Sequence, residues 1–111
     1  MKKPQKNMQI YRLGTMLETP GAITTLEREQ DEGWQLLLFL RMHNLVSHSN
    51  WPSKKEDLGP EFKIMTDDLT EEGFAVLKEG FYKWLDSNDD INRTGIKMDV
   101  LEKALEKVRK S

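Results

Sequence analysis

Hydrophobic side chains recur at helical spacing in the first half of the chain. Apolar positions at residues 7–18 predict a helix that ends at a Thr-Pro-Gly sequence, and a threonine at 24 or 25 can cap a second, short helix. Residues 33–44 are apolar on nearly every side, so we expect a buried helix there. The Asp-Glu-Gly sequence at 31–33 either forms a turn before this helix or lies within one long, fused helix.

The second half carries two clearer amphipathic patterns. A helix at about residues 70–87 is predicted because its apolar side chains follow at spacings of three and four, with Asp68 and Glu71 as a capping pair. A last helix, at about residues 97–110, has one apolar stripe: Met98, Leu101, Leu105 and Val108. A helix this short is not stable alone, so the stripe must pack on the domain or on a second subunit.

Strand-like patterns occupy the region between these helices. Leu45 and Val46 are followed by a polar loop that runs through Gly59 and Pro60. Residues 62–66 then alternate between apolar and polar side chains, as in a short strand. The sequence Leu-Thr-Glu-Glu-Gly at 69–73 opens the next helix.

This order of elements resembles a winged helix-turn-helix domain, and the Leu-Thr-Glu-Glu-Gly sequence after a wing recurs in bacterial regulators of that class. The resemblance implies a mostly α fold with a small β-hairpin, a winged-helix-like domain at residues 8–87. Before it we expect a basic, disordered N-terminus at residues 1–7. After it, at residues 88–111, we expect a loop and a C-terminal amphipathic helix for packing or dimerisation.

The resemblance also implies that the third helix lies in the major groove of DNA. Its outward face would carry Gln35, Leu38, Phe39 and Met42, which is mostly apolar. Base reading calls for Arg, Lys, Asn, Gln or Ser at such positions. We therefore expect Leu38, Phe39 and Met42 to be buried within the chain or, as the alternative, to contact a partner.

The loop in the position of the wing offers further candidate contacts. Trp51, Lys54 and Lys55 combine an aromatic ring with two positive charges. They could touch a phosphate backbone, and Trp51 could instead anchor another protein. A simpler alternative, which we rank first, is that Trp51 folds back onto the domain and the lysines are solvated.

Composition narrows the functional class. The chain has 111 residues, no cysteine and a net charge of −2, with basic ends and acidic stretches at residues 27–32 and 56–72. The sequence lacks an apolar signal core or a stretch long enough to span a membrane, so we expect a cytoplasmic protein. The Asp-rich segment from residue 86 fails as a calcium loop in either register, and His43 and His48 lack further ligands at metal-binding spacing.

We therefore expect no enzyme, metal or cofactor, but a small binding module whose partner is a protein. One concrete version is an acidic antagonist of a basic protein, like an immunity protein or antitoxin, and another is a regulatory adaptor. The alternative is a dimeric winged helix-turn-helix transcription regulator. In that alternative the stripe on the last helix dimerises, and DNA phosphates are contacted by Lys2, Lys3, Lys6, Lys54 and Lys55.

Overall fold

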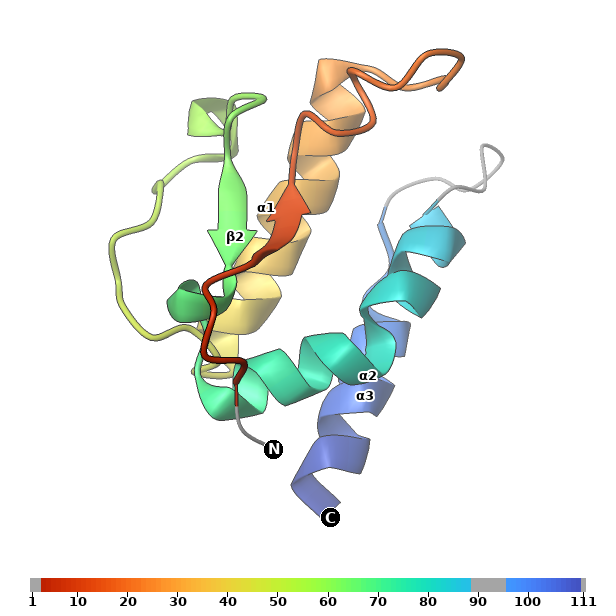
Figure 1. The fold of residues 1–111 in the computed structure, drawn as a ribbon. Helices are drawn as coiled ribbons and strands as arrows, with labels where there is room; N and C mark the ends of the chain where they lie inside the picture. The colour runs from red at the N-terminus through yellow and green to blue at the C-terminus, as the bar shows by residue number, and fades with distance from the viewer. Residues whose placement is uncertain (1–2, 89–95, 111) are drawn as a thin grey trace.

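A computed structural model describes residues 3–88 and 96–110 of the chain. The elements are β1 (Gln9–Arg12), α1 (Leu26–Met42), the 3-10 helix η1 (Lys55–Asp57), β2 (Lys63–Met65), the 3-10 helix η2 (Thr66–Asp68), α2 (Glu71–Asn88) and α3 (Asp99–Lys110). The two strands lie side by side across α1, while α3 runs along α2 (Figure 1). The expected class, mostly helical with a small antiparallel sheet and a C-terminal amphipathic helix, is confirmed.

The N-terminal segment is a strand, so the helix predicted at residues 7–18 is wrong. β1 pairs antiparallel with β2, with Tyr11 opposite Ile64. Tyr11 and Leu13 are both buried, which is the period of two that a strand requires. The strand then continues close to the loop before β2, where the Gly14 amide donates to the Pro60 carbonyl oxygen at 3.0 Å. A side chain at Gly14 would collide with that oxygen, which would lie 2.7 Å from an added Cβ.

The strand predicted at residues 62–66 is present as β2, but its partner is β1 and not Leu45–Val46. Val46 forms a single isolated bridge with Leu69 instead. Backbone hydrogen bonds from Leu13 to Phe62 and from Thr66 to Met8 extend the β1–β2 pairing at both ends. The N-terminal strand therefore takes the place that the wing-like interpretation gave to residues 45–46.

Residues 26–42 form one continuous helix, which decides between the alternatives left by the sequence. Thr25 caps α1, since its hydroxyl accepts a hydrogen bond from the Arg28 amide at 3.2 Å. Gly33 lies inside the helix because β1 packs against it: an added Cβ would lie 3.2 Å from Leu13 and 3.3 Å from the Tyr11 hydroxyl. This glycine therefore marks a close approach of strand and helix, not a turn.

Helix α2 matches the predicted helix at residues 70–87, but its cap differs. The Thr70 hydroxyl, not Asp68, accepts the hydrogen bond from the Gly73 amide at 3.0 Å. A Cβ on Gly73 would overlap the carbonyl oxygen of Leu45, to which the Thr70 amide also donates. The glycine of the Leu-Thr-Glu-Glu-Gly sequence is thus required by the backbone that enters the loop.

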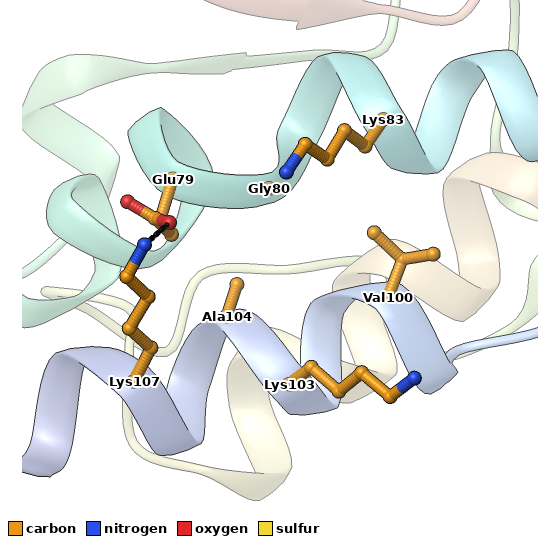
Figure 2. Close-up of a pocket in the computed structure, with 7 residues that line it drawn as sticks. All are labelled: Glu79, Gly80, Lys83, Val100, Lys103, Ala104 and Lys107. Atoms are coloured by element: carbon orange, nitrogen blue, oxygen red, sulfur yellow. Dashed lines mark hydrogen bonds and ion pairs between the residues drawn. The ribbon is translucent and has the colours of Figure 1, made fainter.

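Helix α3 packs against α2 within the same chain. Leu101 and Leu105 are buried there, and Met98 and Val108 are half-buried at the ends of the same contact. Gly80 of α2 faces Ala104 of α3, so the two backbones approach closely (Figure 2). The stripe proposed for dimerisation is therefore used to complete the core, and Leu101 and Leu105 are not available to a second subunit.

One hydrophobic core joins the two strands and the three α-helices. Its fully buried side chains include Leu36, Leu40, Leu45, Ile64, Leu69, Val76, Trp84 and Leu101. Across residues 3–88 and 96–110, every helix is too short or too polar to cross a membrane.

Candidate functional site

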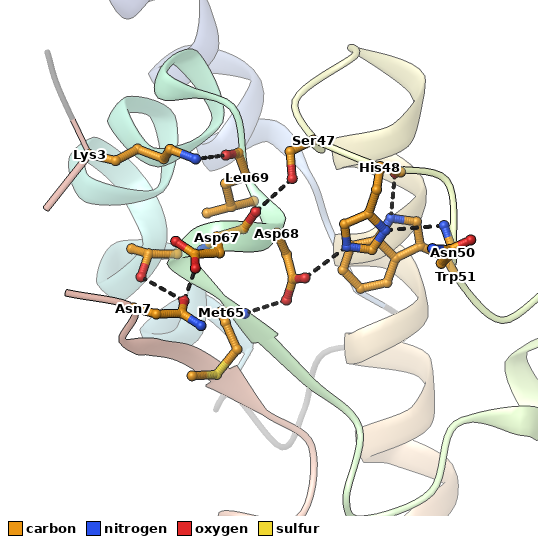
Figure 3. Close-up of polar contacts among 11 residues, drawn as sticks. Lys3, Asn7, Ser47, His48, Asn50, Trp51, Met65, Asp67, Asp68 and Leu69 are labelled. Atoms are coloured by element: carbon orange, nitrogen blue, oxygen red, sulfur yellow. Dashed lines mark hydrogen bonds and ion pairs between the residues drawn. The ribbon is translucent and has the colours of Figure 1, made fainter. Parts of the chain in front are cut away.

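The wing-like loop, which carries the candidate contacts Trp51, Lys54 and Lys55, packs against the domain. Trp51 is half-buried, its ring stacks on His48 with centroids 4.7 Å apart, and its edge contacts Phe62. Its indole N–H donates to the His48 carbonyl oxygen at 3.0 Å (Figure 3). The alternative in which Trp51 folds back is therefore the one observed.

A polar network fixes the same loop to η2 and to the N-terminal segment. His48 Nε2 lies 2.8 Å from Asp68 Oδ1, and the other oxygen of Asp68 accepts from the Met65 amide at 2.8 Å (Figure 3). From the N-terminal side, Lys3 donates to the Leu69 carbonyl oxygen and Asn7 accepts from the Asp67 amide. These groups satisfy one another and hold three chain segments together.

The two lysines of the loop differ in their surroundings. Lys55 Nζ lies 2.7 Å from Asp31 Oδ1 of α1, and this hydrogen bond raises the pKa of the lysine. Lys54 is exposed. Part of the positive charge that the DNA-binding alternative assigned to phosphate contacts is therefore engaged by the acidic stretch of α1.

The face of α1 expected to point outward is not one continuous apolar surface. Phe39 is 3% exposed and belongs to the core, so for this residue the expected burial is observed and the alternative, contact with a partner, is wrong. Leu38 is half-buried, and only Met42, at 72% exposed, presents a large apolar side chain. Burial within the chain, the first of the two expectations, therefore accounts for most of this face.

Exposed apolar side chains gather instead between β1 and α2, in what we call the β1–α2 groove. Met8, Met16, Ile23 and Tyr82 line it, and Ile23 and Tyr82 are 84% and 78% exposed. The groove consists of three hollows of about 380, 250 and 220 Å³, and neighbouring hollows share lining residues. Gln9, Ile10, Tyr11 and Arg12 of β1 form one wall, and α2 forms the other.

The strand beside this groove has an open edge. β1 pairs with β2 along one side only, and within residues 3–88 and 96–110 no strand pairs with its other side. An open strand edge can accept an added strand through backbone hydrogen bonds. The groove therefore joins a backbone-binding edge to a set of exposed apolar side chains.

Two carboxylates from α1 lie at the end of the groove, in the hollow that we call the acid cleft. Glu29 and Glu32 line it, and both are largely removed from solvent. The Tyr11 hydroxyl and the Asn88 side-chain amide each donate to Glu32 at 3.2 Å, and the Thr24 hydroxyl donates to Glu29 at 2.8 Å. Burial, followed by the charge of Glu29, raises the pKa of Glu32 to about 7.

The acid cleft also contains an unsatisfied acceptor. The side-chain oxygen Oδ1 of Asn88 is buried and has no hydrogen-bond partner among the described residues. The backbone carbonyl of the same residue accepts from the Arg28 guanidinium. Tyr11 is buried beside the two glutamates, and desolvation together with their negative charge raises the pKa of its hydroxyl far above the usual range.

A second polar hollow lies on the α2–α3 side of the molecule. Lys83 of α2 and Lys103 and Lys107 of α3 surround it, and its volume is about 270 Å³ (Figure 2). Lys107 forms an ion pair with Glu79 at 2.6 Å, and this hydrogen bond lowers the pKa of Glu79. The hollow is basic, in contrast to the acid cleft.

Part of the β1–α2 groove could be predicted from the sequence. The acidic character of residues 27–32 was recognised, but Glu29 and Glu32 were not predicted to line one cleft. Their spacing of three on a helix was the clue. The groove itself was missed because residues 9–12 were predicted to be helical, so no strand edge was expected.

Comparison with other proteins gives no family: no family model matches the chain, and neither the search of curated proteins nor that of solved structures yields a match. In the part of the chain that the structure describes, no group of three or more His, Cys, Asp or Glu side chains is placed to hold a metal ion. The function is therefore inferred from the surface itself.

Proposed function

We propose that the protein is a small non-enzymatic binding module that takes an extended segment of a protein partner along the β1–α2 groove. The observation that carries this proposal is the cluster of exposed Met8, Met16, Ile23 and Tyr82 beside an open strand edge. Contiguous exposed apolar side chains are typical of interaction sites, whereas single ones are ordinary.

The groove also indicates the chemistry of the partner. A segment added to the open edge of β1 gains backbone hydrogen bonds, and alternate side chains then point toward the groove. The apolar walls favour apolar residues at those positions. The negative charge of Glu29 and Glu32 favours a basic residue at one end, so the preferred occupant is a segment of a basic protein. An immunity-like or antitoxin-like antagonist and a regulatory adaptor are both proteins of this kind.

Selection from a library of random peptides on phage tests this proposal. Peptides about twelve residues long can run the length of the groove, because an extended chain rises about 3.3 Å per residue. We expect the selected peptides to alternate apolar residues and to include a basic one. Their affinity should fall at least about tenfold in the double variant Ile23→Ser/Tyr82→Ala, because the groove loses its most exposed apolar walls.

Met42→Ser is the matched control for this experiment. Met42 is a large exposed apolar side chain, at 72%, and it does not line the groove. Its substitution should leave the affinity of the selected peptides unchanged. A library that yields no binder, or binders weakened equally by both variants, would contradict the proposal.

A second candidate is the DNA-binding, winged-helix-like regulator, and the basic hollow between α2 and α3 favours it. Lys83 and Lys103 could contact phosphates there, in place of the Lys55 side chain that is paired with Asp31. This candidate predicts binding to a mixed-sequence duplex that weakens steeply with salt and is lost in Lys83→Ala/Lys103→Ala. Lys54→Ala, which alters an exposed lysine of the loop, separates this face from the wing. Absence of binding at low salt would exclude the candidate.

A further inference from the structure

The acid cleft has more hydrogen-bond acceptors than donors. Glu29, Glu32 and Asn88 line the same small hollow, and the amide oxygen of Asn88 is buried without a partner among the described residues. The donors supplied by Tyr11, Thr24 and the Asn88 amide nitrogen occupy only part of the acceptor capacity of the glutamates. Asn88 is 3% exposed, and a buried acceptor without a partner costs free energy unless a water molecule or a ligand supplies the missing donor.

The electrostatics of the cleft favour a cation. Three carboxylates line it, from Glu29, Glu32 and Asp86, against the single guanidinium of Arg28. That guanidinium is already directed to the Asn88 backbone carbonyl. Helix α2 also ends at Asn88, so the negative end of its dipole points to the cleft. The raised pKa of Glu32 is what burial of two neighbouring carboxylates produces when no further counter-charge is present.

We propose that the acid cleft binds one guanidinium group, the head group of an arginine in the partner segment, between Glu29, Glu32 and the Asn88 amide oxygen. This inference rests on the proposed function, and it names the basic residue that the groove would select.

A guanidinium fits better than an ammonium for three reasons. It presents up to five donors in a planar fork, which suits several acceptors arranged around one small space. It is weakly hydrated and stays charged when buried. Tyr82, which lines both the cleft and the neighbouring hollow, offers an exposed aromatic face on which it can stack. The cleft volume of about 220 Å³ suits one such head group and is below the range of about 300–1,000 Å³ usual for small-molecule sites.

Titration of the 111-residue protein with ethylguanidinium chloride, followed by amide chemical shifts in NMR, tests this inference. N-ethylurea is the neutral, planar control, and ethylammonium chloride is the control for charge without the fork. All three are compared at constant ionic strength and above the pKa of Glu32, which is about 7. We expect saturable shifts centred on Glu29, Glu32 and Asn88 with ethylguanidinium, and affinities about tenfold weaker for the other two compounds.

Matched variants locate the binding. Glu32→Gln should abolish the saturable response, whereas Glu27→Gln, which changes an exposed carboxylate on the same helix, should leave it intact. If Glu32→Gln does not fold, the three-compound comparison on the wild type decides alone. Equal shifts with all three compounds, tighter binding of ethylammonium, or no saturable shift would overturn the inference.

The outcome is independent of the test for the proposed function. Groove-binding peptides that lack arginine, together with no response to ethylguanidinium, would overturn the arginine pocket and keep the binding module. A saturable ethylguanidinium site in a protein that selects no peptide would keep the pocket and remove the extended segment as its source.

Discussion

The wing-like loop and the β1–α2 groove lie on the same small domain, but their side chains are in opposite states. In the loop, Trp51 stacks on His48, and His48 is paired with Asp68. In the groove, Ile23 and Tyr82 are exposed, and the buried oxygen of Asn88 has no partner among the described residues. The loop packs its conspicuous side chains against the domain, whereas the groove leaves apolar side chains in contact with solvent.

This difference separates residues that look functional from surfaces that can act. A tryptophan, a histidine and lysines in a polar loop are conspicuous in a sequence, yet here most of them serve to fix the chain. The exposed apolar side chains of the groove come from the residue before β1, from the connection between β1 and α1, and from α2. They become a surface only when β1 and α2 are brought together.

The largest expected effect on stability is that of replacing Gly73, which lies against the backbone at the start of the loop. Gly73→Ala should lower the free energy of unfolding by about 3 kcal/mol, because the new methyl group overlaps the Leu45 carbonyl oxygen and neither backbone can move without breaking the Thr70 hydrogen bond. Urea unfolding measures this. Lys78→Ala, an exposed position on the same helix, should change stability by less than about 0.5 kcal/mol. If the two substitutions prove equally mild, the loop is not held by this contact.

The free energy of unfolding should depend on pH through Glu32, which lines the β1–α2 groove. Its pKa is raised from 4.5 to about 7, so its carboxyl group favours the folded state most when protonated, below about pH 4.5. That contribution is lost as the pH rises through about 7. The loss is about 2 kcal/mol after allowance for solvent screening. Glu32→Gln keeps a neutral side chain at every pH, so its stability relative to wild type should rise between pH 5 and pH 8. A constant difference across that range would contradict the burial of this carboxylate pair.

The sequence predicted the helices well because their apolar positions repeat over several turns. The α2 face with Phe81 and Trp84, and the α3 stripe with Leu101 and Leu105, are examples of this signal. It failed at residues 9–12, where a strand of four residues offers only two inward positions and its partner lies more than fifty residues away. Such non-local pairing leaves almost no local trace. The acid cleft was out of reach for the same reason, since it needs Tyr11, Glu32 and Asn88 from three separate elements.

Substitution of Trp51 in the loop should lower the stability by a smaller amount, and it tests the contrast between the loop and the groove. Trp51→Ala removes the stack on His48 and the edge contact with Phe62, and should cost about 1.5 kcal/mol in urea unfolding. Trp51→Phe retains an aromatic ring and should recover part of that loss. Neither variant should weaken peptides selected on the groove, because Trp51 does not line it. A variant that stays folded but loses peptide binding would show that the loop, too, is part of the interface.

The smallest effect on stability is expected where the effect on binding is largest. Ile23→Ser/Tyr82→Ala removes two side chains that are mostly in contact with water, so the unfolding free energy should change by less than about 0.5 kcal/mol per site. Thermal and urea unfolding of this variant should therefore match the wild type, even though its affinity for selected peptides falls. A clear loss of stability would mean that these side chains pack on the domain, as Trp51 does. The β1–α2 groove would then be an ordinary part of the fold, and the contrast between the two regions would disappear.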